Sequence, residues 1–223
     1  MLGHGERGFD GHYYRRFFKN YSKREFEMYC RWSKGWLRFL DKYLDIGRGN
    51  RKRVLELGAS LGYFSKVFRD RGFNVQITDV SPYIIKKARK FQKDANFSVE
   101  NIEKGINTSG QFDVIFAFEV LEHLKDPKSA LVNVRKKLKN GGIFIFSTPF
   151  PTSRSLADPT HINVHEESWW KTLAKKEKYK VVKIIHATFI PYLYRFSSLF
   201  SIGFPVKTDI PFVNSTVFFI LKK

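Results

Sequence analysis

Sulfur is scarce in this sequence. Its 223 residues include one cysteine, Cys30, and two methionines. A single cysteine excludes an internal disulfide and any zinc knuckle built from cysteines. The composition fits a reducing compartment, and we expect a cytoplasmic protein.

Long apolar runs are also missing. The most apolar late stretch, residues 189–204, is interrupted by Pro191, Arg195 and Gly203, so it is too short and too broken to span a bilayer. Residues 1–10 are polar and glycine-rich, with no apolar stretch behind a basic start, and they show no secretory signal. We expect a protein that contacts a membrane at most peripherally.

Acidic residues are few relative to basic ones. The 21 Asp and Glu residues face 40 Lys and Arg residues, which gives a formal net charge of +19. Such a charge suits nucleic acid or an anionic membrane surface. However, many of the basic residues lie in apparently helical stretches, at residues 86–93, 135–139 and 171–180. A solvated helix face explains these clusters without a nucleic-acid partner.

The abundant residues are apolar and aromatic. At 43% hydrophobic and 17% aromatic content, the chain is long enough for one substantial core. Between residues 13 and 44 apolar side chains recur at helical spacing, and Ser22 with Glu25 forms a capping-box pattern. We expect residues 1–50 to form an N-terminal helical layer or lid, and residues 51–223 to form the main domain.

From residue 51 onward, short apolar runs alternate with amphipathic stretches. We expect strands at residues 54–57, 74–80, 96–101, 112–118, 143–147, 180–188 and 214–221. We expect helices at residues 61–71, after Ser81-Pro82, from Asp126-Pro127 to Gly141-Gly142, and at residues 166–176. This alternation predicts an α/β fold with a doubly wound, mostly parallel sheet, which binds ligands at the carboxyl ends of its strands. Residues 149–165 and 189–212 break the rhythm and are expected insertions.

The most informative segment is residues 54–65, Val-Leu-Glu-Leu-Gly-Ala-Ser-Leu-Gly-Tyr-Phe-Ser. It predicts a strand, a glycine-bearing turn and the start of a helix, whose N–H groups favour an anionic group. The dinucleotide fingerprint G-x-G-x-x-G fails, because positions 60 and 63 are Ser and Tyr. A phosphate-binding loop fails too, because no Gly-Lys-Ser or Gly-Lys-Thr follows.

The segment resembles the first motif of class I S-adenosylmethionine-dependent methyltransferases. In their E-x-G-x-G-x-G frame this chain has Glu56, Gly58, Ser60 and Gly62, so serine replaces the middle glycine. The resemblance implies a Rossmann-like domain with a seven-stranded sheet in the order 3-2-1-4-5-7-6, the last strand antiparallel. It also implies S-adenosylmethionine as the cofactor, held by these four residues.

Further motifs extend the resemblance over about 95 residues. Asp79 and Val80 end the second strand, where the family binds the ribose hydroxyls, and Glu100, Asn101 and Ile102 end the third, where it contacts adenine. Either Glu100 or Asn101 can supply the polar adenine contact. A carboxylate accepts hydrogen bonds from both ribose hydroxyls, which favours Asp79.

The fourth strand ends at Phe118, a further expected cofactor contact, and leads into Val-Leu-Glu-His at residues 120–123. This ending is common in small-molecule methyltransferases. Residues 138–143, Leu-Lys-Asn-Gly-Gly-Ile, resemble the family's turn into the fifth strand. Tyr14, in the aromatic segment before the first long helix, is expected to cover the cofactor as part of a lid, where an aromatic face attracts the sulfonium.

Three histidines are candidate general bases: His123, after the fourth strand, and His161 and His165, after the fifth. Each also fits a purely structural role. Asp158, His161 and His165 are metal-ligand types, but Pro159 and the missing helical pattern indicate a loop and not a helical His-x3-His site. We therefore expect no metal.

The acceptor is the least determined feature. The Val-Leu-Glu-His segment, the histidine-rich loop and the aromatic stretch at residues 189–212 favour O-methylation of a small molecule, a glycan or a lipid-linked intermediate. An RNA or protein methyltransferase that uses the basic surface is the alternative, but no nucleic-acid module and no N/D-P-P-Y/F motif is present. A third hypothesis, motivated by Ser60, is a cofactor-binding scaffold without catalysis.

Overall fold

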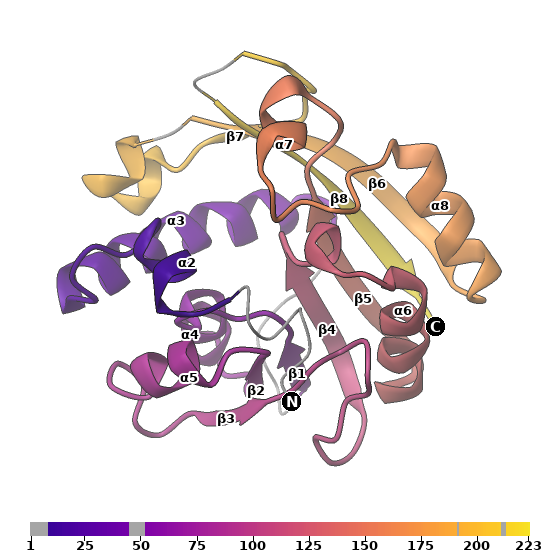
Figure 1. Ribbon diagram of the computed structural model, residues 1–223, viewed down its shortest axis with the longest axis horizontal. Helices are drawn as coiled ribbons and strands as arrows, with labels where there is room; N and C mark the ends of the chain where they lie inside the picture. The colour runs from indigo at the N-terminus through magenta and orange to yellow at the C-terminus, as the bar shows by residue number, and fades with distance from the viewer. Residues whose placement is uncertain (1–8, 45–51, 191, 211–212) are drawn as a thin grey trace.

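The computed structural model describes residues 9–44, 52–190, 192–210 and 213–223. Within these ranges the chain forms an eight-stranded sheet in the order β3-β2-β1-β4-β5-β8-β6-β7, with helices on both faces (Figure 1). The predicted α/β fold class is confirmed. The seven expected strands also take the predicted order, and the additional strand is β7, inside the insertion at residues 189–212.

The strands are β1 (Arg53–Glu56), β2 (Asn74–Asp79), β3 (Asn96–Val99), β4 (Phe112–Phe118), β5 (Leu138–Thr148), β6 (Lys180–Phe189), β7 (Gly203–Phe204) and β8 (Asn214–Lys222). Strands β1 to β5 pair in parallel, whereas β8 pairs antiparallel with both β5 and β6. The short β7 pairs antiparallel with β6 at the sheet edge.

The helices are α2 (Gly11–Arg15), α3 (Lys23–Leu40), α4 (Tyr63–Asp70), α5 (Pro82–Ala88), α6 (Pro127–Lys137), α7 (Ser153–Ala157) and α8 (Glu167–Lys176), with 3₁₀ turns η1 (Leu121–His123), η2 (Leu193–Arg195) and η3 (Ser198–Phe200). Local signals in the sequence explain several starts. Ser22 and Glu25 form the predicted capping box of α3. Ser81 caps α5, with Pro82 at its first position.

Most predicted boundaries differ by one or two residues, and two differences are larger. Helix α6 ends at Lys137 and not at the Gly141-Gly142 pair, because the chain enters β5 at Leu138, which pairs with Phe112 of β4. The expected irregular segment at residues 149–165 contains α7. The predicted boundary between residues 50 and 51 lies outside the described residues.

Alternating strand side chains build one core on each face of the sheet. On one face, Val54 and Phe116 pack with the apolar sides of α3, α4 and α5. On the other face, Leu55 and Phe144 pack with α6 and with Trp170 of α8. Because both faces are covered, the carboxyl ends of the parallel strands are the natural place for a ligand.

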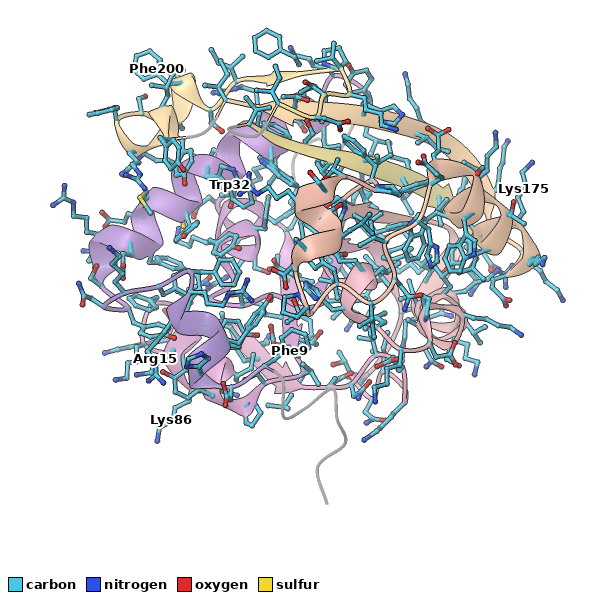
Figure 2. The ribbon with its side chains drawn as sticks, turned by 45° about the horizontal axis from the view of Figure 1, so that its top comes forward. Phe9, Arg15, Trp32, Lys86, Lys175 and Phe200 are labelled. Atoms are coloured by element: carbon cyan, nitrogen blue, oxygen red, sulfur yellow. The ribbon has the colours of Figure 1, made fainter. Side chains whose placement is uncertain are left out.

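Helix α3 also supports the second insertion. Trp36 of α3 stacks on Phe189 at the end of β6, with 4.7 Å between ring centroids. A Cβ atom at Gly35 would lie 1.9 Å from Ser201 Oγ, so only glycine lets this segment approach the helix so closely. Figure 2 shows Phe200 of the same segment at the outer rim of the molecule. In the described ranges, no helix is long and apolar enough to cross a membrane.

Candidate active site

A cavity of about 1230 Å³ opens at the carboxyl ends of β1, β2 and β4. The structure brings most of the predicted cofactor residues together on its wall. These are Tyr14, Gly58, Ser60, Asp79, Val80, Asn101, Ile102 and Phe118. Glu56 and Gly62 are not among the lining residues.

The turn after β1 uses the left-handed region at every second residue. Gly58, Ser60 and Gly62 have φ angles of 65°, 53° and 73°. A Cβ atom at Gly58 would lie 2.5 Å from Val120 Cγ2, so this position requires glycine for space as well as for conformation. Serine tolerates this conformation less well, so Ser60 is strained.

Glu56 lies behind this turn. Its carboxylate accepts a hydrogen bond from the Ser65 backbone N–H at 3.0 Å and another from the Ser65 hydroxyl. Burial raises the pKa of the Glu56 carboxyl to about 8. Gly62 is the N-cap of α4. Both residues therefore hold the start of α4 in place instead of facing the cavity.

Asp79 connects three parts of the cavity wall. Its carboxylate accepts hydrogen bonds from the backbone N–H groups of Ser60 at 2.8 Å and Ser81 at 2.9 Å, and from the Tyr14 hydroxyl at 3.1 Å. Burial raises the pKa of Asp79, although these three donors oppose the shift. The predicted lid residue Tyr14 is thus attached directly to the predicted ribose-binding residue.

The segment after β3 is held by Glu100. Its carboxylate accepts from the backbone N–H groups of Asn107 at 2.9 Å and Thr108 at 3.0 Å. Asn101 Oδ1 accepts from the Glu103 N–H at 3.0 Å. Both side chains therefore order this loop, and Ile102 lies beside them on the cavity wall.

Histidines lie at the other end of the cavity. The rings of His123 and His161 are 4.8 Å apart between centroids, and both line the cavity. The loop that carries His161 is fixed to η1, because the backbone N–H groups of Ile162 and Asn163 both donate to the Glu122 carbonyl at 2.9 Å.

His165 is not brought to this site. Its ring stacks on Trp169 with 3.7 Å between centroids, and its Nε2 lies 3.1 Å from Asn163 Oδ1. The metal-ligand set considered from the sequence does not assemble either. Asp158 instead accepts hydrogen bonds from Arg16 at 2.8 Å and from Thr160 at 2.7 Å, and His165 lies outside the cavity-lining set.

A family profile described as a methyltransferase domain matches residues 24–189. The chain belongs to this methyltransferase family. The resemblance to class I S-adenosylmethionine-dependent methyltransferases is confirmed, and with it the enzyme class predicted from the sequence.

Curated relatives of this methyltransferase match part of its length. A malonyl-[acyl-carrier protein] O-methyltransferase from Serratia marcescens is 29% identical over 97 residues, which cover 44% of this chain and 38% of the relative. A ubiquinone biosynthesis O-methyltransferase from Idiomarina loihiensis is 32% identical over 117 residues, which cover 50% of this chain and 47% of the relative. The chain spans less than half the length of these relatives.

Solved methyltransferase structures share the fold over most of the chain. Magnesium protoporphyrin IX methyltransferase from Synechocystis PCC 6803, solved with bound SAH, superposes with a TM-score of 0.61 at 13% identity, covering 88% of this chain and 84% of that one. A TehB-like SAM-dependent methyltransferase from Corynebacterium glutamicum superposes with a TM-score of 0.58 at 18% identity. The match covers 86% of this chain and 88% of that one.

Two acidic residues of the methyltransferase cavity were missed as site residues by the sequence analysis. Glu119, with a φ angle of 55°, accepts hydrogen bonds at 2.6 Å from the Ser147 and Thr216 hydroxyls. Glu122 is fully buried and lines the cavity beside His123. The Val-Leu-Glu-His segment contained the signal for Glu122, but only the fold shows that His161 joins it.

Proposed function

We propose that this methyltransferase transfers the methyl group of S-adenosylmethionine to an oxygen atom of a hydrophobic, lipid-linked acceptor at a membrane surface. The observation that carries the proposal is the shape of one cavity. The glycine turn and Asp79 line one part of it, His123 and His161 line another, and Tyr192, Tyr194 and other residues of the aromatic insertion border it. A small molecule and a glycan are the other acceptors that the sequence analysis named.

The cofactor fits the part of the cavity around Asp79. An ionised carboxylate offers about four lone-pair positions, so Asp79 can accept from a ribose hydroxyl while it holds the Ser60 turn. The start of α4 offers N–H groups to the carboxylate of the methionine moiety. We also propose that the described part of the expected N-terminal layer, residues 9–44, acts as the lid over this part, since Tyr14 donates to Asp79.

The acceptor hydroxyl fits the histidine end. Methyl transfer needs the accepting oxygen, the methyl carbon and the sulfonium sulfur in line. A hydroxyl acceptor must also lose its proton, which calls for polar groups beside it. His123 and His161 are the polar side chains that meet this requirement, and both named relatives are O-methyltransferases.

The aromatic insertion supports a lipid-linked acceptor. Many of its apolar side chains are exposed: Tyr192, Leu193, Phe196, Leu199, Phe200, Ile202, Phe204, Val206 and Ile210. Phe196 and Leu199 are 80% and 71% exposed. Many exposed apolar side chains within one segment are a feature of protein or membrane contact sites.

The insertion is held rigidly while its apolar side chains face outward. Arg31 of α3 donates to the carbonyls of Tyr194 at 3.2 Å and Arg195 at 3.0 Å. Arg38 donates to the Ser198 carbonyl at 2.6 Å. The formal net charge of +19 suits the anionic headgroups of a membrane. The mouth of the cavity would then face the bilayer, where the tail of a lipid-linked acceptor resides.

Label transfer tests the reaction. The protein is incubated with S-adenosylmethionine labelled in its methyl group and, separately, with total lipid extract, total RNA and total protein. We expect label in the solvent-extractable lipid fraction, as a methyl ether or ester. Label confined to RNA or protein would refute the proposal and favour the basic-surface alternative, and cofactor binding without transfer to any pool would favour a scaffold.

Flotation with vesicles tests the membrane surface. Neutral phosphatidylcholine vesicles isolate apolar insertion from charge attraction. The double variant Phe196→Ser/Leu199→Ser should reduce vesicle binding roughly a thousandfold, because burying each side chain contributes about 2 kcal/mol. Val182→Ser, at an exposed position of β6, is the control and should bind like wild type. Equal binding by all three proteins would contradict the assignment of this surface.

A further inference from the structure

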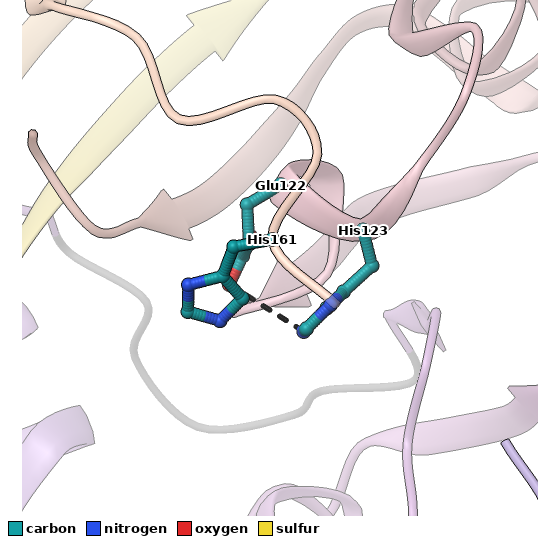
Figure 3. Close-up of side chains that lie close together, drawn as sticks. All are labelled: Glu122, His123 and His161. Carbon is teal, nitrogen blue, oxygen red and sulfur yellow. Dashed lines mark ion pairs between the residues drawn. The ribbon is translucent and has the colours of Figure 1, made fainter. Parts of the chain in front are cut away.

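Three side chains with metal-binding atoms converge at the histidine end of the cavity. Glu122 and His123 come from η1, and His161 comes from the loop after α7. One ligand atom from each lies within 4.8 Å of the other two, and His123 Nε2 is 3.9 Å from Glu122 Oε1. Figure 3 shows the three side chains facing one another.

The hydrogen bonds of the two histidines fix their tautomers. His123 Nδ1 lies 2.9 Å from the Thr160 carbonyl oxygen, and His161 Nδ1 lies 2.9 Å from the Ser155 carbonyl oxygen. A carbonyl oxygen only accepts, so each Nδ1 carries the hydrogen and each Nε2 keeps a lone pair. Metal-binding histidines are oriented in the same way in proteins, with the second ring nitrogen donating to a carbonyl or carboxylate.

Glu122 adds a carboxylate that lacks a partner. Its side chain is 0% exposed, and neither carboxylate oxygen has a hydrogen-bond partner among the residues that the structure describes. Burial and the nearby Glu119 carboxylate raise the pKa of Glu122. A buried carboxylate is costly unless it is paired or binds a metal.

The nearby cation Arg16 does not pair with Glu122. Arg16 is paired with Asp158 at 2.8 Å. Phe9 and Tyr13 pack edge-on against His123, with centroid distances of 5.4 and 6.3 Å. The Glu122 carboxyl and the Nε2 atoms of His123 and His161 therefore lie together without an ion pair to Arg16.

We propose that Glu122, His123 and His161 bind a divalent transition-metal ion, with zinc as the reference case. Two imidazole nitrogens and one carboxylate oxygen form a donor set used by catalytic zinc sites, which leave a fourth position open. Metal–ligand bonds of about 2.0–2.2 Å in a tetrahedron place ligand atoms roughly 3.4 Å apart. The 3.9 Å between His123 Nε2 and Glu122 Oε1 is close to this value, so small side-chain rotations complete the site.

The role of the metal rests on the proposed O-methylation. The open position faces the cavity and takes the acceptor hydroxyl, whose pKa falls on coordination. The hydroxyl proton passes to water in the open cavity. The oxygen then forms a bond to the methyl carbon, the carbon–sulfur bond breaks, and its electron pair goes to the sulfur, which becomes a neutral thioether. The histidines hold the metal in this arrangement instead of taking the proton themselves.

Metal binding is tested without cofactor or acceptor. Chelator-treated protein is titrated with zinc alone by calorimetry, and in parallel with manganese and magnesium. Wild type should bind one zinc ion with a dissociation constant in the micromolar range or tighter, and more strongly than magnesium. Glu122→Gln and His161→Ala should each weaken zinc binding at least tenfold, whereas His165→Ala, outside the cavity, should not.

The controls keep this result separate from folding and from the proposed reaction. Thermal unfolding of each metal-free variant reports whether it folds. If His161→Ala does not fold, Glu122→Gln still tests the site, because it keeps the size of the side chain. No saturable zinc binding by wild type, or equal weakening by His165→Ala, would overturn the proposal and leave the histidines as general bases. If zinc binds as expected but no pool accepts label, the proposed O-methylation fails while the metal site stands.

Discussion

Ser60 offers a direct test of the turn that opens the cofactor part of the cavity. Its φ angle of 53° costs an L-residue roughly 1–2 kcal/mol relative to glycine. Replacement by glycine removes this strain but adds about 0.5–1 kcal/mol of backbone entropy to the unfolded chain. Ser60→Gly should therefore stabilise the protein by about 0.5–1 kcal/mol, which is about 1–4 °C in melting temperature for a chain of this size.

Lys178 provides a matched control for the same strain. It follows α8, is exposed, and has a φ angle of 63°. The backbone N–H of the next residue, Tyr179, donates to the Ala174 carbonyl at 3.0 Å, as in a helix end that favours glycine. Lys178→Gly should raise stability by a similar amount, far from the cavity.

Urea unfolding of the two variants and wild type measures the effect, and calorimetry with S-adenosylmethionine measures its consequence. We expect both variants to gain stability and Ser60→Gly to keep cofactor affinity, because the Ser60 backbone N–H still donates to Asp79. A loss of stability in Ser60→Gly alongside a gain in Lys178→Gly would refute the strain argument. A tenfold loss of affinity in Ser60→Gly alone would show that the hydroxyl contacts the cofactor.

Four further perturbations address the rest of the site. Asp79→Asn should weaken S-adenosylmethionine binding at least tenfold in calorimetry, since it removes the carboxylate proposed to accept hydrogen bonds from the ribose hydroxyls. Unchanged affinity would show that the cofactor pocket lies elsewhere. Burial raises the pKa of Glu56 from 4.5 to about 8. Between these pH values the folded protein keeps a proton on Glu56 that the unfolded chain has lost, so the contribution of protonated Glu56 to stability is lost as the pH rises towards 8. Urea titrations between pH 5 and pH 9 (about 4 pH units) should therefore show the stability of Glu56→Gln increasing with pH relative to the stability of wild type. A stability difference that stays constant over this range would contradict the raised pKa. His161→Ala should lower kcat by about a hundredfold with little change in cofactor affinity, while His165→Ala should keep the kcat and the cofactor affinity of wild type. If His161→Ala has the kcat of wild type, His161 has a structural role. Glu122→Gln should change the stability of the metal-free protein by less than about 1 kcal/mol in thermal unfolding, because burial raises the pKa of the Glu122 carboxyl and disfavours its charged form; a large gain in stability would show that the carboxyl is ionised in the folded protein.

The cofactor part of the site was predictable because it depends on short segments. The residues around Gly58 and Asp79 follow directly from the ends of β1 and β2, and neighbouring parallel strands place their carboxyl ends at the same sheet edge. A strand pattern and a motif therefore suffice to bring them together. The role of Glu56 was not accessible in this way, because only the structure shows that its carboxylate faces the Ser65 N–H group and not the cavity.

The acceptor part depends on contacts that no local pattern encodes. His161 reaches His123 because two backbone N–H groups of its loop donate to the Glu122 carbonyl, a pairing between segments that are distant in sequence. His165 has the same local composition but stacks on Trp169. The hydrogen bonds that fix the imidazole tautomers are likewise tertiary, so the sequence alone offered three histidines of equal standing.

The two parts of the cavity each contain a buried carboxyl group, and the two groups differ in their hydrogen-bond partners. Asp79 is surrounded by three donors, so it is satisfied and positions the turn for a ligand with hydroxyl groups. Neither oxygen of Glu122 has a hydrogen-bond partner within the described part of the chain, and the carboxyl lies beside the Nε2 atoms of His123 and His161, the arrangement in which we propose a metal ion. Because a buried polar group without a partner lowers stability, the place of Glu122 beside the proposed methyl acceptor favours a role in the reaction over a role in folding.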